Sequence, residues 1–234
     1  MTVSDISLEL RKLAEPERAE VHQRFFKTGK GEYGEGDRFL GVRVPLIRKL
    51  LRHYRGLPLT DVTALLHSRW HEERLFGLLA MVDSFGRSDR ELRKEIYDLY
   101  MASTQWINNW DLVDLSAPGI PGAWLFDKGR EPLYEFARSS GLWEKRIAIV
   151  STQFFIRNND FSDTLAISAI LLGDVHDLIH KAVGWMLREV GKRDLEIEEK
   201  FLREHYMEMP RTMLRYSIER FPEEKRQDYL KGRI

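Results

Sequence analysis

The sequence of 234 residues predicts an all-α fold in which helix pairs stack into a solenoid. Apolar residues recur at helical spacing along nearly the whole chain, and no run alternates apolar and polar residues as a strand would. Segments that begin with tryptophan also recur, because those starting at Trp70, Trp106 and Trp143 lie 36 and 37 residues apart. A related helix begins near Ile179, 36 residues later. This period is typical of HEAT-like or armadillo-like repeats, so we expect one repeat domain over residues 1–234.

The first helices are separated by proline and glycine. Ser4 or Asp5 is suited to cap a helix that ends near Leu13, and Pro16 is suited to the first position of the next helix. Residues 29–36 hold four glycines and predict an irregular loop.

After this loop, Phe39, Leu40 and Val44 are expected to pack inward. Pro45 is expected to begin a basic amphipathic helix that ends near Arg55. Further helices are expected over residues 61–67, 72–85, 89–102, 131–138, 143–157, 162–172, 175–190, 195–206, 212–220 and 223–230.

The composition sets broad limits on function. Hydrophobic residues make up 43% of the chain, enough for a sizeable core, and the absence of cysteine excludes thiolate nucleophiles and cysteine-based zinc sites. No segment resembles a leader or a membrane span, so we expect a soluble, cytoplasmic protein that does not bind membranes. The formal net charge is +0, but basic residues gather between Arg43 and Arg55, which permits a positive groove on a neutral molecule.

The stretch from Trp106 to Leu125 places aromatic and acidic residues side by side. If Asn109 caps a helix, Trp110 and Asp114 project from the same face one turn apart. An indole face attracts a cation or a sugar ring, and a carboxylate stabilises positive charge that develops in a transition state. Asp111 fits a structural role at the positive end of the helix dipole. The plainer alternative is that Trp110 packs in the core and Asp114 is a solvated or capping acid.

Stacked repeats would place equivalent positions on one concave surface. Arg74, Trp110 and Arg146 fall at intervals of 36 residues, so they are expected to share that surface with Asp114. Arginines and indoles along one groove are suited to the phosphates and sugars of a nucleic acid.

Further cations are expected to extend this groove. Trp185 has Lys181 four residues before it and Arg188 three residues after it. Arg157 is expected on one helix stripe with Arg146. The basic face of the helix that begins at Pro45 would also suit a polyanion, which adds Arg43 and Arg48 to the expected DNA-binding residues.

The sequence gives only weak support to two other kinds of site, a metal site and a nucleotide-binding loop. His67 with His71, and His176 with His180, have the spacing of two metal ligands on a helix, but neither pair has the glutamate of a His-Glu-x-x-His zinc motif. The loop over residues 29–36 lacks the Gly-Lys-Ser/Thr ending of a P-loop and follows no strand. We therefore expect neither a metal nor a nucleotide cofactor.

Four separated stretches resemble one family in the right order. FLGVRVPLIRKL at residues 39–50, WDLVD at 110–114, WEKRIA at 143–148 and KAVGWMLRE at 181–189 are similar to the AlkD-type DNA alkylation-repair glycosylases. That resemblance implies a single curved, right-handed α-solenoid of HEAT-like helix pairs, and it suits a monomer.

The resemblance also implies an activity. Family members excise bases alkylated at ring nitrogens, such as 3-methyladenine and 7-methylguanine, from duplex DNA by hydrolysing the N-glycosidic bond without extruding the base. The catalytic carboxylate would fall on Asp114, the two DNA-facing tryptophans on Trp110 and Trp185, and the arginine that grips the backbone on Arg146.

The chemistry supports this assignment independently of the resemblance. A base alkylated at N3 or N7 is cationic and already a good leaving group, so neither a general acid nor a metal is needed. What remains is to stabilise the positive sugar and to place a water, and a carboxylate does both. Two other classes stay open: a non-catalytic solenoid that binds bent, branched or damaged DNA by shape, and a protein-interaction scaffold that uses the acidic residues between Asp194 and Glu204.

Overall fold

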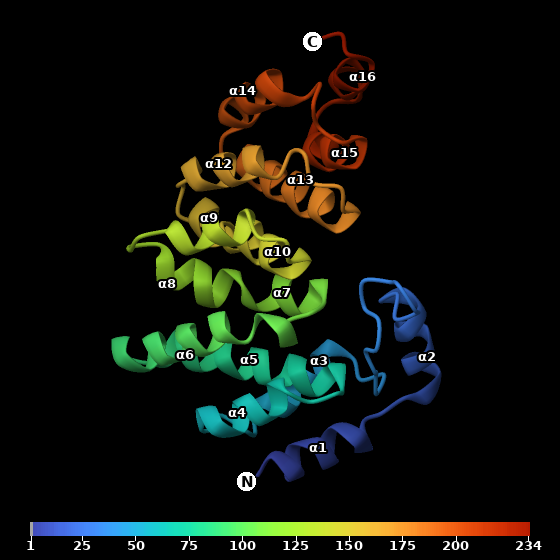
Figure 1. Ribbon diagram of the computed structural model, residues 1–234, viewed down its shortest axis with the longest axis vertical. Coiled ribbons are helices and arrows are strands. Elements are labelled where there is room, and N and C mark those ends of the chain that lie inside the picture. Colours follow the sequence, from blue (N-terminus) through green and yellow to red (C-terminus); the bar gives the residue numbers. More distant parts are fainter. Residues whose placement is uncertain (1) are drawn as a thin grey trace. The chain divides into compact units, whose positions relative to one another are not determined.

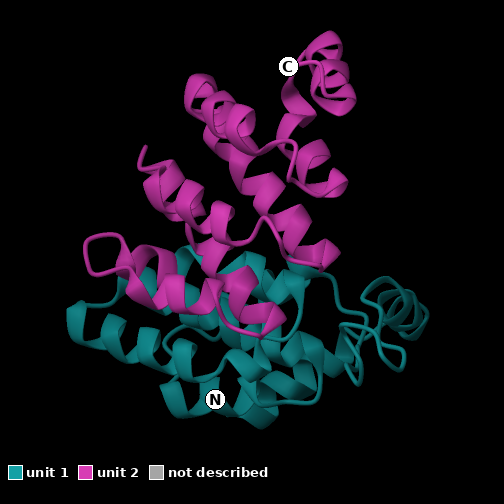
Figure 2. Cartoon of the chain, turned by 45° about the horizontal axis from the view of Figure 1, so that its top comes forward, with its two compact units in different colours: residues 1–120 teal, residues 121–234 magenta. Residues whose placement is uncertain are grey.

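The computed structural model describes residues 2–234 and is all-helical over them, as predicted, with one isolated β-bridge between Arg38 and Trp70 in place of any strand. The chain forms two compact units, residues 1–120 and residues 121–234 (Figure 2). No helix within residues 2–234 is long and apolar enough to cross a membrane. A single repeat domain with solenoid curvature stays a prediction.

The first unit contains six longer helices and the short segments around the Trp110 helix (Figure 1). Its elements are α1 (Val3–Lys12), α2 (Pro16–Phe25), α3 (Val44–Leu51), α4 (Leu59–Leu66), α5 (His71–Arg87), α6 (Arg90–Ala102), η1 (Thr104–Trp106) and α7 (Trp110–Ser116). The helix α5 lies at its centre and packs against α3, α4, α6 and α7. Fully buried side chains such as Leu66, Phe76, Leu78 and Met81 form this core.

The second unit repeats the plan of helices packed on helices. Its elements are α8 (Ala123–Leu125), α9 (Glu131–Ala137), α10 (Leu142–Ser151), α11 (Gln153–Arg157), α12 (Ser162–Ile170), α13 (Asp177–Gly191), α14 (Leu195–His205), α15 (Arg211–Ser217), η3 (Ile218–Arg220) and α16 (Glu223–Lys231). A π-helical turn, η2 (Pro118–Gly122), contains the chain junction between the units. The helix α13 contacts α10, α12, α14 and α15, so it is the central helix of this unit.

The helix starts follow local capping chemistry. Pro16 is the first residue of α2, as predicted. The expected cap of α1 at Ser4 or Asp5 is wrong, because Thr2 is the cap and forms a capping box with Asp5: the Asp5 N–H donates to Thr2 Oγ1 and the Thr2 N–H donates to Asp5 Oδ2.

Two helix ends differ from the sequence expectation. The helix expected to run to Arg55 ends at Leu51, and the following turns lead to Gly56, whose φ is +75°. The helix expected over 143–157 is divided at Thr152, whose hydroxyl donates to the Ile149 carbonyl at 2.7 Å. The predicted continuous stripe from Arg146 to Arg157 is therefore broken.

The glycine-rich segment is irregular, as predicted, and it packs closely against α2. A Cβ at Gly34 would lie 2.5 Å from the Phe26 carbonyl oxygen, so only glycine fits there. Phe39 and Leu40 are buried as expected, whereas Val44 is only half-buried. This segment carries the chain from α2 to α3.

Candidate active site on the Trp110 helix

The helix α7 begins where the sequence predicted. Asn109 is its cap, and Asn109 Oδ1 accepts a hydrogen bond of 2.9 Å from the Trp110 N–H. Trp110 and Asp114 lie one turn apart on this helix, and both side chains are half-buried. The predicted indole and carboxylate therefore lie on the same side of one short helix.

Aromatic rings from α2 and the following segment fix the indole of Trp110. The Phe26 ring stacks on it with centroids 5.2 Å apart, and the Phe25 ring meets it edge-on at 6.0 Å. Phe26 also stacks on Phe39 at 4.9 Å, and Phe39 stacks on the His71 ring at 4.5 Å. This row of rings packs Phe26 against Trp110 and limits the positions that the indole can adopt.

A buried ionic cluster supports the first turn of α7. His71 Nε2 lies 2.8 Å from Asp111 Oδ2, and His71 Nδ1 lies 3.1 Å from Asp37 Oδ2. Arg74 donates to the other oxygen of Asp37, and Asn109 Nδ2 donates to Asp37 Oδ2 at 3.2 Å. All five residues are buried. The cluster joins the residue that follows the glycine-rich segment, the start of α5 and the start of α7.

The charges in this cluster stabilise one another. Burial lowers the pKa of His71, but the nearby Asp111 carboxylate and the hydrogen bonds to both aspartates outweigh it and raise the pKa to about 9. Burial raises the pKa of Asp37, but hydrogen bonding to His71 and the Arg74 charge leave it below its usual value. The cluster therefore holds an imidazolium and a guanidinium between two carboxylates.

Glu72 holds the segment before α3 in a similar way. Its two carboxylate oxygens accept backbone hydrogen bonds of 2.8, 2.8 and 3.2 Å from Leu40, Gly41 and Val42. A pocket of about 300 Å³ adjoins this arrangement and is lined by residues that include Phe25, Phe26, Phe39, His71, Glu72 and Asp111.

Two residues have roles that the sequence interpretation missed. Asp111, interpreted as a partner of the helix dipole, is the ion-pair partner of His71. Arg74, expected on a concave surface, is buried in an ion pair with Asp37, so its predicted surface position is wrong. One signal was available: His71, Leu75 and Leu78 share one core-facing stripe of α5, which marks His71 as buried.

The second unit carries the other predicted catalytic and backbone-gripping residues. Arg146 is buried on α10, and its Nη1 donates to the Leu178 carbonyl at 2.6 Å. Trp185 is half-buried on α13, and its Nε1 donates to Glu189 Oε1 at 3.1 Å. Within this unit, α10 packs against α13. These two residues therefore lie on neighbouring helices.

Most of the predicted DNA-binding cations have acidic or polar partners. Lys181 pairs with Asp177 at 2.7 Å, Arg188 pairs with Glu219, and Arg43 lies 3.7 Å from Glu15. Arg157 donates to Gln153 at 2.7 Å, and Arg48 is exposed on α3. A phosphate would have to compete with these partners at Lys181, Arg188, Arg43 and Arg157, and with the Leu178 carbonyl at Arg146.

The histidine pairs have structural roles. The His67 ring stacks on Trp106 at 4.7 Å, while His71 belongs to the buried cluster. His176 caps α13 by accepting from the Leu178 N–H, and His180 Nε2 contacts the Asp174 carbonyl. Residues 2–234 contain no group of three or more histidine, cysteine or acidic side chains placed to hold a metal ion.

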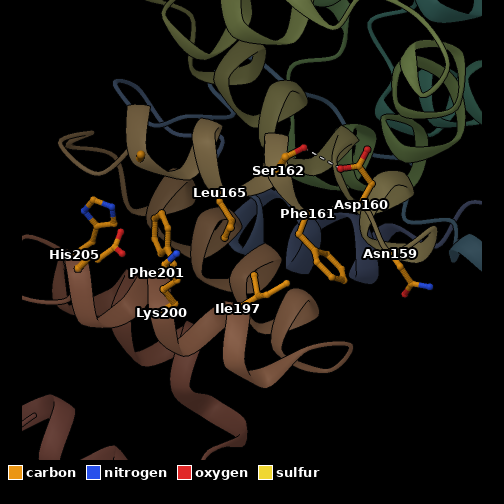
Figure 3. Close-up of a pocket in the computed structure, with 11 residues that line it drawn as sticks. Asn159, Asp160, Phe161, Ser162, Leu165, Ile197, Lys200, Phe201 and His205 are labelled. Carbon is orange, nitrogen blue, oxygen red and sulfur yellow. Dashed lines mark hydrogen bonds between the residues drawn. The ribbon is translucent and has the colours of Figure 1, made fainter.

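A pocket of about 680 Å³ lies between α12 and α14 in the second unit (Figure 3). Leu165, Ile197 and Phe201 line it together with polar residues, and Ser162 donates to Asp160 at its edge at 2.9 Å. None of the residues predicted to act on DNA lines this pocket.

Comparison with known proteins decides the family. A family model described as "DNA alkylation repair enzyme" matches residues 6–221. The chain belongs to this family. The sequence prediction of a DNA alkylation-repair family is therefore confirmed.

A solved structure has the same fold. It is described as "Predicted DNA alkylation repair enzyme from Enterococcus faecalis", is 16% identical, and aligns with a TM-score of 0.71 over 90% of this chain and 97% of that one. No curated protein matches the sequence.

Proposed function

We propose that this DNA alkylation repair enzyme is a glycosylase that excises cationic alkylated bases, of the 3-methyladenine and 7-methylguanine type, from duplex DNA. The observation that carries the proposal is the pairing of Trp110 and Asp114 one turn apart on α7, in a family of alkylation repair enzymes. The aromatic row and the buried cluster hold this helix in place, as a site that must position a reacting atom requires.

The reaction breaks the bond between the sugar C1′ and the base nitrogen. The cationic base takes the bonding electrons and leaves as a neutral molecule, so no proton donor is required. Asp114 stabilises the positive charge left on the sugar and orients the water whose oxygen bonds to C1′, and the proton that this water loses is released to the solvent. The π face of Trp110 attracts the same cationic sugar.

The second unit contributes the remaining parts of the proposal. Trp185 is a second aromatic contact for the sugar, and Arg146 is the contact for the lesion's phosphate backbone. Lys181, Arg188, Arg43, Arg48 and Arg157 bind phosphates along the duplex. The base stays in the duplex, and neither a metal nor another cofactor takes part.

The experiment is to incubate methylated duplex DNA with the wild-type protein and identify the products by chromatography. We expect free 3-methyladenine and 7-methylguanine, alkali-sensitive abasic sites in the DNA, and the same rate in EDTA. DNA binding without base release would contradict the proposal and favour a shape-recognising DNA binder. Restoration of an unmodified base in intact DNA would show direct dealkylation instead.

A further inference from the structure

His71 occupies an unusual position for a histidine. It is the first residue of α5, its side chain is 2% exposed, and each ring nitrogen faces a carboxylate oxygen. A neutral imidazole has one N–H and one lone pair, so it would turn a lone pair toward one of the two carboxylates. Only the imidazolium donates to Asp37 and to Asp111 at the same time.

The charged groups around the ring come from three parts of the chain, and the two aspartates favour the charged form. Asp37 directly follows the glycine-rich segment and Asp111 is on α7, while Arg74 and Glu72 come from α5 itself. Arg74 opposes the imidazolium, but it also pairs with Asp37. The four groups His71, Arg74, Asp37 and Asp111 together carry no net charge, which offsets the cost of burying them.

The cluster holds Trp110 from both of its neighbours in the chain. Asn109, the cap, donates to Asp37, and Asp111 accepts from His71. The helix α7 has only seven residues, so its first turn fixes the direction in which Asp114 projects. Loss of the hydrogen bond from His71 to Asp111 would release one anchor of this turn.

We propose that His71, as an imidazolium, is the positioning residue that holds Trp110 and Asp114 in their reactive arrangement. This inference rests on the proposed glycosylase function. A displacement of about 1 Å at a reacting group can reduce a rate by roughly 100-fold, so the effect should appear in the excision step more than in DNA binding.

The first test uses the wild-type protein and needs no activity. The Cε1–H resonance of His71 is followed by NMR from pH 6 to 10.5, after assignment with His71→Gln. We expect a midpoint near pH 9 that falls in Asp111→Asn, because the neighbouring negative charge is removed. A midpoint near 6.5 would contradict the proposal.

The second test measures single-turnover excision of 7-methylguanine against pH. We expect the wild-type rate to fall above about pH 9, and His71→Gln to be slower by roughly 10- to 100-fold without that fall, at similar affinity for DNA. The matched control is His67→Gln, which changes an exposed histidine four residues before His71. It should behave as wild type. Equal rates and pH profiles in wild type and His71→Gln would overturn the proposal.

These outcomes are distinct from failure of the proposed function. A wild-type protein that releases no base refutes the glycosylase, whereas a wild-type protein that releases base independently of His71 refutes only the positioning role. If His71→Gln does not fold, Asp111→Asn tests the same contact through its rate and through the His71 midpoint.

Discussion

Glu198 is a buried carboxyl on α14 for which Oε1 has no hydrogen-bond donor within residues 2–234. Burial, reinforced by the nearby Glu199 charge, raises its pKa to about 8. In the unfolded chain this group ionises near its ordinary pKa, so the unfolded state loses the proton first as pH rises. Glu198 therefore lowers the free energy of unfolding progressively as pH rises from about 4.3 to about 8. Above pH 8 this loss of free energy has reached its full value.

Replacing Glu198 by glutamine removes this cost. At pH 9 we expect Glu198→Gln to have a free energy of unfolding on the order of 2 kcal/mol higher than wild type, measured by urea unfolding. Near pH 4 this difference in free energy should be lost. Glu196→Gln, an exposed change on the same helix, should alter neither value. The prediction would be refuted if the difference in free energy of unfolding between Glu198→Gln and wild type did not grow between pH 5 and pH 8.

At the same scale, Asp111 and Asp114 show what spacing can and cannot tell. Their positions on the helix were predictable, because Asn109 is a capping residue and Trp110 and Asp114 follow it as an i, i+4 pair. The division of labour between them was not, because the partner of Asp111 is His71, 40 residues earlier. A single sequence contains no signal for that long-range contact, only the apolar stripe that marks His71 as buried.

At the scale of elements, the backbone that leads from α2 to α3 depends on Gly41. Its φ is +82°, and a Cβ there would lie 2.2 Å from the Glu15 carbonyl oxygen and 2.7 Å from the Ala19 nitrogen. We expect Gly41→Ala to lower the free energy of unfolding by roughly 2–4 kcal/mol, since it adds backbone strain to a steric clash.

Gly31 supplies a matched comparison. Its φ is +79°, but a Cβ there meets nothing within 4 Å, so Gly31→Ala carries only the conformational cost of about 1 kcal/mol. Urea unfolding of both variants measures the difference. Equal losses of stability would show that the close approach at Gly41 has no energetic importance.

Helix positions were largely predictable, and the errors have local causes. Periodicity, Pro16 and Asn109 located α2 and α7 correctly. The division at Thr152 was missed because a side-chain hydroxyl that bonds to its own backbone does not change the hydrophobic pattern.

At the scale of the whole molecule, the formal charge of zero hides local basic patches. Each phosphate contact releases counterions, so the slope of log binding constant against log salt counts such contacts. We expect Arg48→Gln to reduce the magnitude of that slope on duplex DNA by about 0.9. Lys94→Gln on α6, which removes an exposed charge outside the predicted interface, should leave it unchanged. Equal slopes for Arg48→Gln and wild type would remove Arg48 from the interface.

The family could be predicted from the sequence because four motifs occur in order along the chain. The all-helical fold class could be predicted from the helical periodicity. The buried cluster around His71 was not, since its members come from three segments that only the tertiary structure brings together. The division into two units was likewise absent from the sequence expectation.

In the proposed mechanism, base excision depends on the Asp114 carboxylate. The measurement that tests it most directly compares single-turnover release of 3-methyladenine and 7-methylguanine by wild type and by Asp114→Asn, with the exposed change Asp98→Asn as control. We predict that Asp114→Asn folds and binds DNA like wild type but excises both bases at least about 100-fold more slowly, and that Asp98→Asn is unaffected. Equal rates for wild type and Asp114→Asn would contradict the account.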